Sequence, residues 1–144
     1  MKSALRALAA VVTALLVTFL LVVAVELFSG VVHPLPEDFG GTTEEMCRHV
    51  ERYPHWVLAV VVAAWAAAAF VGTWTAKRMG NLYSFAIVGL LLLAALVFNL
   101  SKLPYPMWFK IANLLAIPAA IVAGGRFSTR RPTECGKMGP GSRL

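Results

Sequence analysis

The sequence predicts an all-α membrane protein, a bundle of four transmembrane helices with a short interfacial helix in the first external loop. Of its 144 residues, 59% are hydrophobic and only 14% are charged, and the mean hydropathy is +0.74. Soluble domains carry about 25% charged residues, and their apolar residues rarely form long unbroken runs. A helical span needs about 20 mostly apolar residues. Four such runs place one membrane domain over residues 1–126.

The four predicted spans follow the apolar runs and cover residues 7–28, 56–76, 82–100 and 107–123. The first run follows Lys2 and Arg6, as the apolar part of a signal peptide does. It exceeds the usual 7–15 residues of such a segment, and residues 25–30 form a poor cleavage site. We therefore expect a retained membrane anchor.

Basic residues indicate the orientation of the bundle. Lys and Arg gather before the first run, in the link at 77–78 and in the tail after residue 125, whereas five acidic residues lie in the 33–55 loop. The positive-inside rule then places both termini in the cytoplasm. The net charge of +6 is explained by this orientation. The lipid bilayer is thus an expected partner and nucleic acid is not.

The external loop and the tail have different expected structures. His33-Pro34-Leu35-Pro36 ends the first helix, because Pro disfavours helix at the residue before it. Thr42 and Glu45 have the spacing of a capping box, which predicts a short helix that continues to Tyr53. The Gly- and Pro-rich residues 127–144 predict a disordered cytoplasmic tail.

One layer of polar residues near the external ends of the spans is the candidate site: Glu26, Asn99, Lys110 and Asn113. Glu26 and Lys110 lie at matching depths, and charges within a span are costly unless they are paired or face a wet cavity. One interpretation is a structural ion pair with Lys110 reaching the interface. The other is a polar pocket for a small solute, an ion or a lipid headgroup. The ion pair is the simpler reading.

The external loop also contains four residues of types that bind metals, His33, Cys47, His49 and His55. Their spacing matches no known zinc motif, so interfacial histidines in an acidic loop are the preferred interpretation. We expect no cofactor. We also expect Cys47 and Cys135 not to pair, because the predicted topology places them on opposite sides of the membrane.

The second span contains small residues at four-residue spacing: Ala64, Ala68, Gly72 and Ala76. Small residues in this register let two helix backbones approach closely. The stripe therefore predicts helix packing, within the bundle or between copies of the chain.

Several of these residues together resemble a family of small four-span bacterial integral membrane proteins whose activity is uncharacterised. The resemblance rests on Glu26, the His33–Pro36 segment, Asn99 with Pro104-Tyr105-Pro106-x-Trp108-Phe109, Pro118 and Gly124-Gly125. It covers most of the chain up to about Phe127. It implies the four-span architecture and no particular activity.

Two functions from different classes remain compatible with these patterns, with a third as a weaker alternative. The first is a non-catalytic accessory or interaction subunit that packs against itself or a larger membrane complex. The second is a carrier or channel for a small solute or ion, with an outward-facing polar site around Glu26 and Lys110. The weaker alternative is a metal-handling protein or enzyme that uses the loop histidines. No catalytic residue stands out, and an enzyme is the less expected class.

Overall fold

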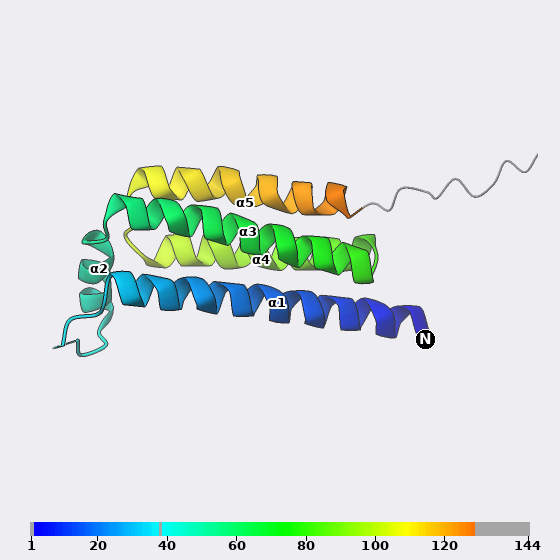
Figure 1. Cartoon of the computed structure of the whole chain (residues 1–144), viewed down its shortest axis with the longest axis horizontal. Coiled ribbons are helices and arrows are strands. Elements are labelled where there is room, and N and C mark those ends of the chain that lie inside the picture. Colours follow the sequence, from blue (N-terminus) through cyan, green and yellow to red (C-terminus); the bar gives the residue numbers. More distant parts are fainter. Residues whose placement is uncertain (1, 38, 129–144) are drawn as a thin grey trace, which may run out of the picture.

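The computed structural model describes residues 2–37 and 39–128, and this part of the chain is all-helical, as the sequence predicts. Of the predicted tail at 127–144, Phe127 ends the last helix and residues 129–144 lie outside the described residues. A short helix crosses one end of a bundle of four long helices (Figure 1). We call that end the α2 end, and the opposite end, where the chain begins, the amino-terminal end. The helices are α1 (Lys2–Val32), α2 (Thr43–Glu51), α3 (His55–Met79), α4 (Leu82–Lys102) and α5 (Met107–Phe127).

Helix α3 is the centre of the bundle. It packs against α1, α4 and α5, and α4 also contacts α1 and α5. Within the described residues, α1 and α5 lie on opposite sides of α3 and do not pack against each other (Figure 1). Any site shared by α1 and the α4–α5 link must therefore lie beside α3.

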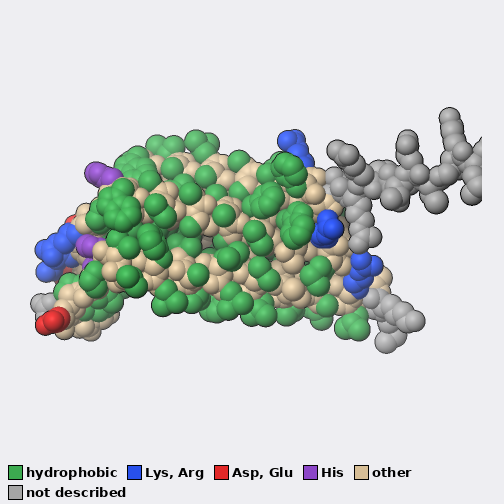
Figure 2. Space-filling view, in the orientation of Figure 1, with side chains coloured by type: hydrophobic (Ala, Val, Ile, Leu, Met, Phe, Trp, Pro, Cys, Tyr) green, Lys and Arg blue, Asp and Glu red, His purple; other side chains and the backbone are tan. Residues whose placement is uncertain are grey.

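The long sides of the bundle are apolar, and the charges lie at its two ends (Figure 2). Large hydrophobic side chains such as Phe19 (63% exposed) and Leu90 (70% exposed) point away from the core. All four long helices have the length and composition to cross a membrane. The architecture is thus that of a multi-pass integral membrane protein, which confirms the predicted fold class. The helices extend beyond the predicted apolar runs. For example, α1 begins at Lys2 and continues to Val32, whereas the predicted span covers residues 7–28.

The short helix α2 has the predicted capping box. The hydroxyl of Thr42 accepts a hydrogen bond from the Glu45 N–H at 3.3 Å, and the Glu45 carboxylate accepts one from the Thr42 N–H at 3.1 Å. Helix α2 ends at Glu51, two residues earlier than expected, and Pro54 then precedes α3. This reciprocal cap holds α2 as a separate helix across the end of the bundle.

The small-residue stripe of α3 lies mainly at helix interfaces. Ala68, Gly72 and Ala76 are buried, whereas Ala64 is half-buried. A methyl group on Gly72 would collide with the Thr18 hydroxyl of α1. The stripe therefore brings α1 and α3 into close contact within one copy of the chain.

Candidate functional site

The α2 end contains a cavity of about 300 Å³ beneath α2. Its walls come from α1, α3, α4, α5 and the α4–α5 link, and α2 forms its roof. The polar residues that line it are Glu26, Ser29, His49, Tyr53, Asn99 and Tyr105. A polar cavity of this size is unusual in a bundle whose long sides are apolar, so we treat it as the candidate site.

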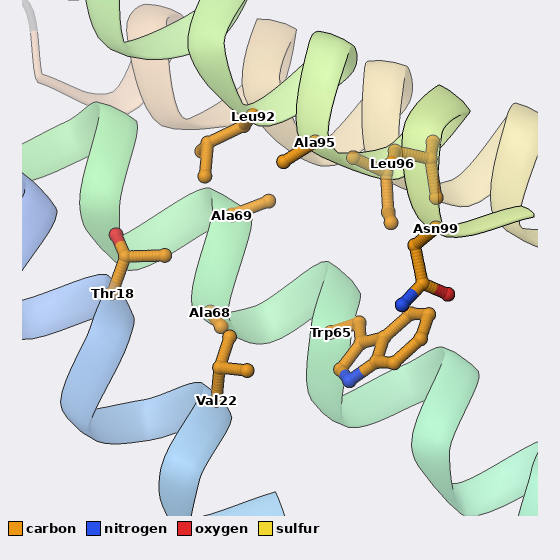
Figure 3. Close-up of a pocket in the computed structure, with 10 residues that line it drawn as sticks. Thr18, Val22, Trp65, Ala68, Ala69, Leu92, Ala95, Leu96 and Asn99 are labelled. Carbon is orange, nitrogen blue, oxygen red and sulfur yellow. The ribbon is translucent and has the colours of Figure 1, made fainter. Parts of the chain in front are cut away.

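A second cavity of about 150 Å³ is lined by residues of α1, α3 and α4 (Figure 3). Its lining from Thr18 to Leu92 places it nearer the amino-terminal end of the bundle than the first cavity. Thr18 and Val22 of α1 line one side, and Leu92, Ala95 and Leu96 of α4 line the other. Trp65 and Asn99 line both cavities. The two cavities are therefore neighbours, with these two side chains between them.

Toward the amino-terminal end, α1 and α4 pack directly against each other. There the Ser84 hydroxyl donates a hydrogen bond to the Ala7 carbonyl at 3.3 Å, and Ala14 packs in one buried cluster with Val88. Toward the α2 end, the cavities take the place of direct contact between the two helices. The site is closed at the amino-terminal end of the bundle and roofed by α2 at the other.

Two polar atoms next to the cavities are buried and lack a hydrogen-bond partner within the described residues. They are the side-chain oxygen of Asn99 and the indole N–H of Trp65. Figure 3 shows these two side chains next to each other at one end of the smaller cavity. Nearly all buried polar groups in proteins are paired, so an acceptor and a donor left over at a cavity indicate that it holds water or a polar solute.

Glu26 provides the formal charge of the larger cavity. Its side chain is exposed and is among the residues that line the cavity. Within the described residues Glu26 forms no ion pair, since the ion pair found there joins Arg48 and Glu44 of α2 at 3.0 Å. No Lys or Arg is among the residues that line the cavity.

The other titratable groups of the cavity are neutral at physiological pH. Burial lowers the pKa of His49, and the positive charges of His33 and Arg52 lower it further. Burial also raises the pKa of Tyr105 to about 12, and the negative charges of Glu26 and Tyr53 contribute to this shift. For Tyr53, burial and the Glu26 charge raise the pKa, and a hydrogen bond with Ser29 opposes them. The influence of Glu26 on both tyrosines reflects their position around one cavity.

Three rings attach α2 to the end of α1. His33 stacks on His49 with 4.5 Å between ring centroids, and Tyr53 lies 4.6 Å from His33 and 5.3 Å from His49. The Nε2 atom of His33 is buried without a hydrogen-bond partner among the described residues. This stack holds the roof of the cavity in place.

The structure brings together only part of the predicted polar layer. Glu26 and Asn99 line the same cavity, but Lys110 and Asn113 do not. Lys110 is half-buried on α5 and forms no ion pair within the described residues. Asn113 is fully buried and donates a hydrogen bond to the Phe109 carbonyl at 3.0 Å within α5. The expected pairing of Glu26 with Lys110 is therefore not formed, because α1 and α5 lie on opposite sides of α3.

The candidate metal ligands do not form one cluster within the described residues. His33 and His49 stack on each other, His55 packs against Trp108 at 5.9 Å, and Cys47 is a free thiol on α2. Residues 2–37 and 39–128 contain no group of three or more His, Cys, Asp or Glu side chains that could hold a metal ion. Cys135 lies outside the described residues.

Sequence reasoning did not assign Ser29, Tyr53, Trp65 or Tyr105 to a site. Tyr53 was expected only as the end of the short helix in the external loop, and Tyr105 appeared only within a motif of the resemblance. The position of Trp65 at a cavity was not predictable, because a single tryptophan in an apolar run can equally well face lipid, pack in the core or line a cavity. Their shared position depends on how the helices are arranged around α3.

The fold and the cavity together define a class: a small multi-pass membrane protein with a polar cavity at one end of its bundle. No family model, curated protein or solved structure matches the chain at a significant level. The resemblance described above therefore remains an expectation from the sequence.

Proposed function

We propose that this protein binds a small solute in the cavity beneath α2, as a carrier or receptor in a bacterial inner membrane. The observation that carries the proposal is the cavity itself. Within residues 2–37 and 39–128, its carboxylate forms no ion pair, and two buried polar atoms at its border have no hydrogen-bond partner. Charges within membrane segments are expensive, and they usually mark the paths of substrates or ions. An accessory subunit that acts only by packing has no need of these features.

The orientation follows from the distribution of Lys and Arg. Arg6, Lys77, Arg78 and Arg126 lie at the amino-terminal end of the bundle, and the acidic loop lies at the other end. The positive-inside rule makes the amino-terminal end cytoplasmic, so the cavity opens on the external side. A cavity in this position takes its solute from outside the cell.

Cysteine labelling tests this proposal. In a Cys47→Ser/Cys135→Ser background, Asn99→Cys places a thiol in the cavity, and Val97→Cys places one on the exposed apolar face of the same helix. A membrane-impermeant maleimide added outside intact cells should label Asn99→Cys and not Val97→Cys. Millimolar solutes of at least one charge class should slow the labelling of Asn99→Cys.

Two results contradict the proposal. The first is an Asn99→Cys thiol that resists the maleimide as completely as the Val97→Cys thiol does. The second is labelling that no cation, anion or neutral solute slows. Labelling only from the cytoplasmic side, in inverted vesicles, would refute the proposed orientation.

A further inference from the structure

The charge balance of the cavity is uncompensated. Glu26 is its formal charge, the cavity has no Lys or Arg in its lining, and His49 is neutral at physiological pH. Glu26 lies six residues before the end of α1, roughly 9 Å along the helix axis. A carboxylate at this depth is stabilised by a cation within its reach. Within the described residues, no side chain supplies one.

Aromatic rings form the wall of the cavity on the side of α3 and α5. Tyr105 lies 4.6 Å from Phe109 between ring centroids, and Phe109 lies 5.8 Å from Trp65. All three residues line the cavity that Glu26 lines. Ring faces carry negative electrostatic potential, and they attract organic cations when the charge lies within about 6 Å of the centroid. The rings also provide apolar surface for the alkyl groups that such cations carry.

We propose that this cavity is a binding site for an ammonium group, with Glu26 as its counter-ion and Tyr105, Phe109 and Trp65 as its aromatic wall. This inference rests on the proposed solute site and specifies the ligand class. The side-chain oxygen of Asn99, which has no hydrogen-bond partner in the described part of the chain, accepts a hydrogen bond from an N–H or hydroxyl group of the ligand. The cavity volume of about 300 Å³ lies at the small end of ligand pockets. It suits a small amine or the headgroup of one lipid.

The test compares three small probes on the full chain in nanodiscs of phosphatidylglycerol, a lipid without an ammonium group. The probes are choline, its uncharged isostere 3,3-dimethylbutan-1-ol, and acetate. Choline should raise the thermal unfolding temperature and the other two should not. Choline and the alcohol have nearly the same shape, so the difference between them reports the charge.

Paired variants separate the carboxylate and the ring faces from general damage. Glu26→Gln should weaken choline binding at least about tenfold, and Tyr105→Leu about tenfold. Tyr105→Phe keeps the ring and should bind choline like the parent chain. The controls, Glu51→Gln on exposed α2 and Tyr83→Leu, remove a carboxylate and a ring outside the cavity and should leave binding unchanged.

The two sources of an ammonium group are distinguished by the lipid. If the ligand is a headgroup, replacing phosphatidylglycerol by phosphatidylcholine should stabilise the parent chain but not Glu26→Gln, without added choline. If it is a free amine, the lipid exchange has no effect and added choline still binds.

Equal stabilisation by choline and its isostere, or stabilisation by acetate alone, would overturn the ammonium site and leave the solute site standing. Choline binding that survives Glu26→Gln and Tyr105→Leu would also overturn it. If none of the probes has an effect and the cysteine labelling is insensitive to every solute, both proposals fail.

Discussion

Replacing Gly124 by Ala should destabilise the bundle, because α5 crosses α3 there without room for a side chain. A Cβ atom at Gly124 would lie 2.6 Å from the Phe70 carbonyl oxygen and would collide with the Thr73 hydroxyl. The Phe70 oxygen belongs to the backbone, so no side-chain rotation relieves the contact. The two helices must separate by roughly 0.5–1 Å, an overpacking that typically costs about 1–3 kcal/mol. The separation also lengthens the 2.6 Å hydrogen bond from Lys77 to the Gly125 carbonyl.

The matched control is Gly30→Ala, because a Cβ atom at Gly30 in α1 meets nothing within 4 Å. Both variants gain up to about 1 kcal/mol of helix propensity, so the difference between them isolates the overpacking. We expect Gly124→Ala to be less stable than Gly30→Ala by about 1–3 kcal/mol. Unfolding in mild detergent by added dodecyl sulfate, followed by tryptophan fluorescence, measures both. Equal stabilities within about 0.5 kcal/mol would refute the close α3–α5 crossing.

Three further predictions concern other contacts. Gly72→Ala should destabilise the α1–α3 contact, because the added methyl group collides with the Thr18 hydroxyl. Adding Thr18→Ala should recover most of the lost stability in the same detergent assay. Strictly additive losses in the double variant would contradict this prediction. Thr42→Ala should cost about 1 kcal/mol and speed amide hydrogen exchange in α2, since it removes the capping box; unchanged exchange would refute the cap. Because the pKa of folded His49 lies below its ordinary value of 6.5, the unfolded chain binds more protons as the pH falls below 6.5. Docking of α2 against the bundle should therefore weaken on acidification, which faster amide hydrogen exchange in α2 would show. The effect should be smaller in the His49→Gln variant. An equal loss of protection in the parent chain and the variant would exclude His49 as the cause.

The architecture was predictable because membrane insertion depends on local features of the sequence. Apolar length sets the spans, and the spacing of Thr42 and Glu45 sets the cap of α2. The exact bounds were less accessible, since α1 continues beyond the apolar run at both ends and α2 stops at Glu51. Helices extend into the interface wherever no Pro or loop residue ends them, so hydropathy underestimates their length.

The candidate site was only half predictable because depth and angular position are different quantities. Counting residues at 1.5 Å each gives the depth of Glu26 and Lys110 in their helices. It does not say which neighbour each helix faces, and with α3 between α1 and α5 the two charges have no common surface. Asn99 reaches the Glu26 cavity because α4 lies next to both α1 and α3. Four apolar helices of similar composition do not encode this arrangement in any short motif.

The position of the cavity follows from a change in residue size along the α1 interface. Toward the amino-terminal end, α1 presents Ala10 and Ala14, and these small buried residues allow close approach to α3 and α4. Toward the α2 end, α3 instead carries the large ring of Trp65, which lines both cavities together with residues of α1. Helices pack at a distance set by the side chains between them. Trp65 lies at this wider part of the bundle and lines both cavities, so the Glu26 carboxylate and the aromatic rings share one space.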